Sequence, residues 1–167
     1  AFQDSDGEIR SVLRVLFNSD AFKQARHKRV KCPAELVAGV LKLAGTHTEP
    51  NTGLIDVGVA TNAMGQELFN PPTVEGWHTG KEWIDGGALN ERINFAVNEL
   101  DDVTKPGIRK IVDRLASEDV SLAPDRFVDK CVELAGDVNV SNVSRSAMLK
   151  SAETGGDLRF DTEEARN

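Results

Sequence analysis

Four residues near the middle of the sequence have side chains that could carry acid–base chemistry. They are one histidine, two carboxylates and one arginine: His78, Glu82, Asp85 and Arg92. A histidine can act as a general base, or it can bind a metal ion together with a carboxylate. The sequence has no pair of histidines four residues apart and no nucleophile-elbow pattern, which are common signatures of such sites. We therefore favour a structural interpretation, with His78 exposed in a turn and Asp85 capping a helix, and keep catalysis as the alternative.

Two tryptophans lie close to this group and could form a binding surface. Trp77 and Trp83 lie on either side of a glycine-containing segment, and their rings could stack on sugars or on the prolines of a partner. Tryptophan is usually largely buried, however, with its indole N–H bonded to a carbonyl. We expect both rings to line the core.

The two cysteines, Cys32 and Cys131, are too few for a disulfide scaffold. No histidine lies near either of them to complete a metal site, and Cys131 falls on an apolar helical stripe where a free cysteine acts as a small hydrophobe. We expect two structural thiols, and we predict no metal site and no cofactor.

The balance of charge argues against general nucleic-acid binding. The net charge is −7 at pH 7, whereas a nucleic-acid binder needs a broad basic surface to neutralise phosphates. One basic stretch contains Lys23, Arg26, His27, Lys28, Arg29 and Lys31. It is short and has no interleaved aromatics, so we interpret it as a solvated connector. No apolar run approaches the ~20 residues of a membrane span.

Apolar residues at helical spacing predict the elements that position these side chains. The predicted helices cover residues 9–16, 33–44, 54–68, 86–100, 106–115, 124–135 and 144–151. Pro33 and Gly45 fit the start and the left-handed stop of the second helix, and Asp85 fits the cap of the fourth. The apolar stripe of the fourth helix consists of Leu89, Ile93, Ala96, Val97 and Leu100. The fold class is therefore all-α, an irregular bundle of about six to seven helices with a long ordered loop.

That loop, from Phe69 to Trp83, is the most distinctive segment of the sequence. Its rigid, turn-forming and aromatic residues are Phe69, Asn70, Pro71, Pro72, Gly76, Trp77 and Trp83. The two prolines fix φ and hold Asn70 extended, which ends the preceding helix. Gly76 permits a turn that returns Trp77 to the body of the protein. We predict a structural clasp between two helices, with binding as the next possibility and catalysis as the last.

The same loop carries a family resemblance. The matching residues are Met64-Gly65-Gln66, Leu68-Phe69, Pro71-Pro72, Gly76-Trp77, Gly80, Trp83-Ile84, Leu89, Arg92 and Asn94-Phe95-Ala96, preceded by Val12 to Phe22 and by Val30 to Leu36. Together they resemble the C-terminal signature of the bacterial domain-of-unknown-function family numbered 1800. The match spans roughly Glu8 to Ala96. In this chain Cys32 stands where the family usually has Ser or Thr, and Glu67 replaces a frequent Pro.

The resemblance implies a larger parent protein. Members of this family are much longer than 167 residues, many are exported, and their genes often neighbour a family that resembles sulfatases. We expect residues 1–167 to form one helical domain or the C-terminal fragment of a larger protein. The family signature would occupy residues 1–100, additional helices residues 101–152 and a polar tail residues 153–167.

The family has no established activity, so the resemblance supplies no mechanism. We expect a helical module of an exported bacterial protein that acts as a scaffold or interaction domain. Its partner would be the rest of its parent protein or another protein, and not a nucleic acid. The alternative is part of a cell-surface hydrolase whose site is completed by a preceding region.

Overall fold

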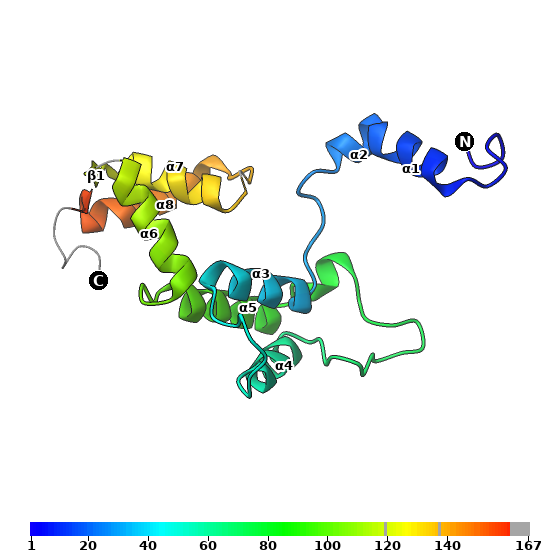
Figure 1. Ribbon diagram of the computed structural model, residues 1–167, viewed down its shortest axis with the longest axis horizontal. Coiled ribbons are helices and arrows are strands. Elements are labelled where there is room, and N and C mark those ends of the chain that lie inside the picture. Colours follow the sequence, from blue (N-terminus) through cyan, green and yellow to red (C-terminus); the bar gives the residue numbers. More distant parts are fainter. Residues whose placement is uncertain (119, 137, 161–167) are drawn as a thin grey trace. The chain divides into compact units, whose positions relative to one another are not determined.

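The computed structural model describes residues 1–118, 120–136 and 138–160. Within them lie eight α-helices, one short 3-10 helix and a two-stranded antiparallel sheet. The predicted mostly α-helical fold is confirmed, with one helix more than the upper number expected. The chain divides into two compact units, Ala1–Val30 and Lys31–Asn167 (Figure 1). In the part of the chain that the structure describes, no helix has the length and apolar character to cross a membrane.

The first unit contains α1 (Ile9–Asn18) and α2 (Asp20–Gln24). The Glu8 carboxylate accepts hydrogen bonds from the first backbone N–H groups of α1, and the Ser19 hydroxyl accepts one from Phe22 N at 3.2 Å. These are the usual caps of helix N-termini. The rings of Phe17 and Phe22 meet edge to face with centroids 5.0 Å apart. The predicted first helix is thus confirmed, although neither α1 nor α2 has a buried residue.

The second unit contains all the remaining elements. They are α3 (Pro33–Ala44), α4 (Leu54–Ala63), the 3-10 helix η1 (Gly80–Trp83), α5 (Gly86–Leu100), α6 (Pro106–Glu118), β1 (Ser121–Leu122), α7 (Pro124–Leu134), α8 (Asn142–Gly155) and β2 (Leu158–Arg159). Helix α3 packs against α4, α5 and α6, and α7 packs against α8. In Figure 1, α3 and α5 run side by side with α4 next to them.

Helix α3 is the centre of the first hydrophobic core. Its buried residues Val37 and Leu41 contact Met64, and partly buried residues of α4 and α5 pack around them. The predicted ends of α3 are confirmed. Pro33 opens the helix, and Gly45 closes it in the left-handed conformation with φ 71°. At this end α3 also lies close to the start of α6. A Cβ atom at Gly107 would overlap the carbonyl oxygen of Leu43, so only glycine fits there.

A second core joins α6 to the two short strands. Leu115, Leu122 and Phe160 are buried together, Leu122 is paired with Leu158, and Phe160 N donates to Val120 O at 3.0 Å. The polar tail predicted for residues 153–167 is therefore wrong for its first part, which completes α8 and forms β2. Strands of two residues are too short to give a periodic signal in the sequence. The remainder, residues 161–167, lies outside the described residues.

Two further predictions about helices need correction. Helix α4 ends at Ala63, not at residue 68, because Gly65 takes a left-handed φ of 91°. Gly65 N donates to Asn62 O and Gln66 N donates to Thr61 O, both at 2.8 Å, so the helix stops in a Schellman motif before the prolines. Helix α8 is longer than predicted and covers 142–155 instead of 144–151.

Candidate functional site

Three residues just before the loop join α4 to α3, and we call them the joint: Met64, Gly65 and Gln66. Met64 is buried in the first core. The Gln66 side chain is also buried, and its Oε1 accepts a hydrogen bond from Ala34 N at 2.9 Å. Ala34 lies in the first turn of α3, where backbone N–H groups have no partner within the helix. The joint therefore uses the end of one helix to cap the start of another.

Sequence reasoning used Gln66 only as a mark of the family and missed this role. A signal existed at Cys32, which precedes α3 and has no side-chain oxygen to accept hydrogen bonds from the helix. The Glu35 carboxylate accepts a hydrogen bond from Cys32 N at 3.0 Å, and the Gln66 side chain accepts one from the next free N–H group, that of Ala34. Only the folded chain shows this second contact, because its partners are 32 residues apart.

The loop ends at Trp83, which is 5% exposed within η1. The prediction that this ring lines the core is confirmed. Trp77 is only half-buried, and it is not among the residues of the two hydrophobic cores. Trp77 Nε1 donates to Glu67 O at 3.2 Å, as expected for a tryptophan N–H bonded to a loop carbonyl. The joint and Trp83 thus fix the two ends of the loop, and we refer to them together as the anchors.

Between the anchors, the loop is ordered by hydrogen bonds within itself. Asn70 Nδ2 donates to Glu67 Oε2 at 2.8 Å. Gly76 N donates to Thr73 O at 3.1 Å, and Thr73 Oγ1 donates to Gly76 O at 3.3 Å. These bonds close a tight turn that Gly76 permits, with φ 104°.

The tip of this loop, residues 69–74, carries apolar side chains into solvent. Phe69 is 95% exposed and Val74 is fully exposed. Pro71 and Pro72 between them are exposed as well. Phe69 has φ 64°, an unusual value for an aromatic residue. Such a backbone costs about 1–3 kcal/mol, and strained residues of this kind cluster at functional sites.

The structure brings two of the four candidate catalytic residues together. His78 Nδ1 lies 3.1 Å from Glu82 Oε2, and both side chains are exposed. The His78 ring meets the edge of Trp83 with centroids 6.4 Å apart. The same Glu82 oxygen accepts from Thr79 N at 3.4 Å, so this carboxylate also holds the start of η1.

Asp85 and Arg92 have other partners. Asp85 Oδ1 accepts from Ala88 N at 2.7 Å and caps α5. Arg92 Nη2 donates to Lys31 O at 2.6 Å, next to the start of α3. Among the described residues, no hydrogen bond or ion pair connects either side chain to the His78–Glu82 pair. The four side chains therefore make three separate sets of contacts: His78 with Glu82, Asp85 with the start of α5, and Arg92 with Lys31.

Helix α5 leaves most of its apolar stripe uncovered. It packs on the first core through Phe95 and also buries Ala88, while Leu89, Ile93 and Val97 are 42–54% exposed. Successive residues of an α-helix are turned by about 100° about its axis. On α5 this places Leu89, Ile93 and Val97 on one side of the helix, and Ala88 and Phe95 on another. We expected an apolar stripe of this kind to face the core, and tertiary packing has selected a different face.

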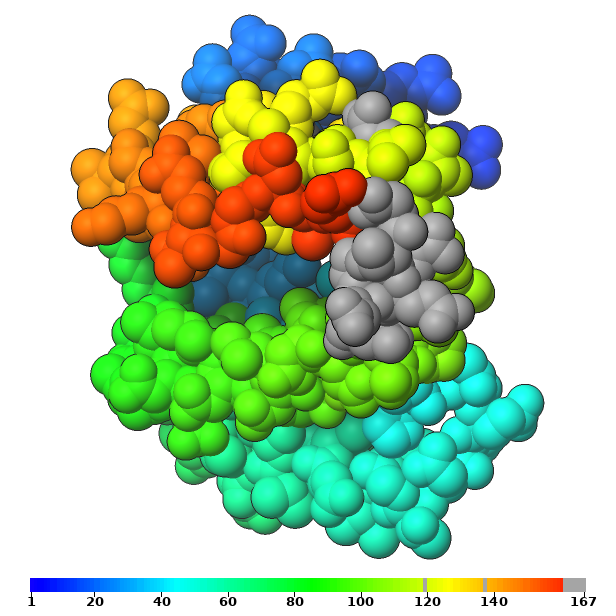
Figure 2. Space-filling model, turned by 90° about the vertical axis from the view of Figure 1, so that its left-hand side faces the viewer, coloured from blue at the N-terminus to red at the C-terminus, as the bar shows by residue number. Residues whose placement is uncertain are grey.

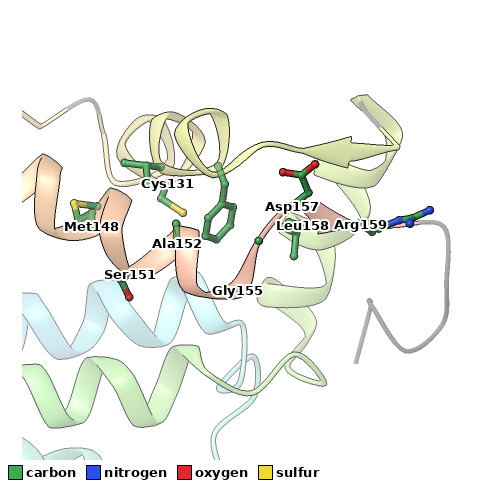
Figure 3. Close-up of a pocket in the computed structure, with 11 residues that line it drawn as sticks. Cys131, Met148, Ser151, Ala152, Gly155, Asp157, Leu158 and Arg159 are labelled. Carbon is green, nitrogen blue, oxygen red and sulfur yellow. The ribbon is translucent and has the colours of Figure 1, made fainter.

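A hollow elsewhere in the second unit lies between the segment α8–β2 and the helices α5 and α6 (Figure 2). One cavity of 440 Å³ there is lined almost entirely by apolar side chains of α6, α7 and their neighbours. A second cavity of 660 Å³ lies between α7, α8 and β2 (Figure 3). Both are lined by Phe127, Cys131 and Leu158.

The chemistry of these cavities is limited. Cys131 is free and half-buried, as is Cys32, and burial raises the pKa of the Cys131 thiol. At neutral pH this thiol stays protonated, so it is a poor nucleophile. Within the described residues, no group of three His, Cys, Asp or Glu side chains is placed to hold a metal ion.

Comparison with known proteins identifies the family. The family model described as a protein of unknown function, DUF1800, matches residues 1–164. No curated protein and no solved structure matches the chain. The loop residues that carried the resemblance in the sequence thus lie inside a match that covers nearly the whole chain. The chain belongs to the DUF1800 family of proteins of unknown function.

Proposed function

We propose that this chain is an interaction module that binds a partner protein through the tip of the 69–83 loop. The observation that supports this most strongly is Phe69, which is 95% exposed on a loop that is held at both ends and hydrogen-bonded inside. A partner with an apolar pocket would bury this ring. Aromatic residues that fill such pockets supply much of the binding energy of protein interfaces.

The backbone of the tip favours recognition. Two consecutive prolines, Pro71 and Pro72, restrict φ and leave few unfolded conformations to lose on binding. The hydrogen bonds from Asn70 and Thr73 add to this order. A preorganised loop loses less entropy on association than a flexible one, so more of the contact energy appears as affinity.

The exposed stripe of α5 supports the same proposal. Leu89, Ile93 and Val97 present apolar area without a charged side chain among them. Contiguous exposed apolar area of this kind is typical of surfaces that bind another protein. A helix of the partner laid along the stripe would bury it, since neighbours at i and i+4 form one ridge on a helix surface.

Hydrolysis of a cell-surface polymer is the second candidate, and it depends on the His78–Glu82 pair at 3.1 Å. A histidine paired with a carboxylate is one component of acid–base catalysis. It ranks second because Asp85 and Arg92, which would complete the site, are engaged in capping α5 and in contacting Lys31. If this candidate is correct, His78→Ala abolishes polymer hydrolysis by the parent protein while binding through Phe69 persists.

The proposed location is outside the cytoplasm, and it rests on the resemblance in sequence alone. Cell fractionation of a tagged parent protein tests it directly. Recovery of the parent protein in the cytoplasmic fraction contradicts the proposed export and leaves the binding proposal to its own test.

Site-specific photo-crosslinking tests the binding proposal. Benzoylphenylalanine is placed at position 69 or 74, and at Lys110 as an exposed control on α6, in cells that produce the protein. We expect the same partner protein to be crosslinked from both loop positions and not from the control. The adduct should disappear in the presence of excess unlabelled chain.

A matched competitor makes this result specific to the tip. Excess chain carrying Phe69→Asp and Val74→Asp should fail to compete, because a charged group in an apolar pocket loses most of the binding energy. The proposal is wrong if positions 69 and 74 give no more adduct than position 110. It is equally wrong if the double variant competes as well as the natural chain.

A further inference from the structure

The first unit has an apolar face that nothing within the unit covers. Its exposed large apolar residues on α1 and α2 are Ile9, Leu13, Val15, Leu16, Phe17 and Phe22, each between 40% and 61% exposed. Neither helix has a buried residue. Helix α2 follows directly on the end of α1 (Figure 1), and the edge-to-face contact of Phe17 with Phe22 brings two aromatic rings together at this junction.

The opposite face of α1 is polar and basic. At 100° per residue, Arg10, Arg14 and Asn18 cluster on one side of the helix, and the apolar residues spread over an arc of about 200°. A helix that packs against a single protein surface needs a stripe of roughly 100°. The wider arc suits a helix that lies half immersed in an apolar medium.

The charge of the first unit opposes that of the whole chain. Residues 1–30 contain six lysines and arginines and four carboxylates, so their side chains sum to +2, whereas the chain carries −7 overall. One of the four carboxylates, Glu8, caps α1, and hydrogen bonds from Ser11 and Arg10 lower its pKa. The basic groups lie on the polar face of α1, in the last turn of α2 and on the segment that follows it.

We propose that residues 1–30 bind the surface of an anionic lipid bilayer. The apolar face of α1, with Phe17 and Phe22, enters the boundary between headgroups and acyl chains, while the exposed side chains of Arg10, Arg14, Arg26 and Lys28 contact lipid phosphates. This is the arrangement of helices that lie in a membrane interface, and anionic lipid adds attraction for each basic residue near the surface. A nucleic acid offers phosphates but no medium for the apolar face.

Vesicle binding by the full chain tests this proposal. The chain is sedimented with vesicles of phosphatidylcholine alone or with about 30% phosphatidylglycerol. We expect at least about tenfold stronger binding to the anionic vesicles, and a loss of about tenfold when salt is raised to about 0.5 M, because salt screens the attraction. Amide hydrogen exchange should slow in residues 9–24 when vesicles are added.

Neutral substitutions separate the apolar contribution from the charge. Leu13→Gln with Leu16→Gln keeps the net charge and a good helix former, and should weaken binding about tenfold or more. Val74→Gln makes the same kind of change on the exposed loop of the second unit and should leave vesicle binding unchanged. Circular dichroism checks that the variants retain their helices, as expected for residues that are not buried.

Three outcomes overturn the proposal. The first is equal binding to neutral and anionic vesicles, or no binding to either. The second is loss of binding with Val74→Gln but not with the double leucine variant, which would assign the membrane contact to the loop. The third is that duplex DNA competes with vesicles for the chain while the two leucine substitutions change neither the vesicle binding nor this competition. The basic residues would then serve a nucleic acid.

Discussion

The anchors and the tip of the loop differ sharply, although both belong to the sequence block that identifies the family. Gln66 and Trp83 are buried and hold the loop to the body of the second unit. Phe69 and Val74, only a few residues away, lie in solvent and contact nothing in the core. Both sets contain rigid or aromatic residues, so residue type alone does not reveal which ones hold the fold.

The comparison teaches that one loop combines two roles. Burial and hydrogen bonding at the anchors offset the free-energy cost of holding the loop in place. The tip includes a strained backbone at Phe69 and an exposed aromatic ring, neither of which stabilises the folded chain. We therefore expect substitutions at the anchors to lower stability, and substitutions at the tip to affect binding alone.

The largest expected effect is at the second anchor. Trp83→Ala removes a large ring that is 5% exposed and should lower the free energy of unfolding by about 3–5 kcal/mol, as for other buried aromatics. Urea denaturation followed by circular dichroism measures this loss. A change below about 1 kcal/mol would show that Trp83 is not an anchor.

An intermediate effect is expected at the joint. Gln66→Leu keeps the size of the side chain and removes the oxygen that accepts from Ala34 N. The unpaired N–H at the start of α3 should cost about 1–3 kcal/mol. Gln66→Glu, which retains an acceptor at that position, is the matched control and should cost less. Equal losses for the two variants would mean that the hydrogen bond contributes nothing.

A smaller effect is expected at Trp77. Trp77→Phe removes only the indole N–H that donates to Glu67 O, a bond between exposed groups. We expect a loss of about 0.5–1.5 kcal/mol by the same denaturation measurement. A loss as large as that of Trp83→Ala would show that Trp77 belongs to the core, as we expected from the sequence.

Several parts of the fold could be predicted because their causes are local. Pro33 and Gly45 fix the ends of α3 through their own backbone preferences, and Asp85 caps α5 through a bond to Ala88, three residues away. The exposed position of His78 and the capping role of Asp85 follow the same local logic. Such features depend on a few neighbouring residues, so spacing in the sequence is enough to find them.

Other parts could not be predicted because they depend on packing between distant residues. Gln66 reaches Ala34 across 32 positions, and Leu158 pairs with Leu122 across the second core. The apolar stripe of α5 looked like a core face, yet Phe95 packs on the core and Ala88 is the buried residue of this helix. Gly65 was tolerable inside a helix by propensity, and only its left-handed backbone shows that α4 ends there.

The most direct test of the difference between the anchors and the tip is the stability of Phe69→Asn. Asparagine tolerates the positive φ of this position better than phenylalanine does. The free energy of unfolding should therefore stay within about 0.5 kcal/mol of the natural chain, or rise slightly, while crosslinking from position 74 to the partner is lost. A loss of more than about 2 kcal/mol would contradict the account, because it would place Phe69 among the residues that hold the fold.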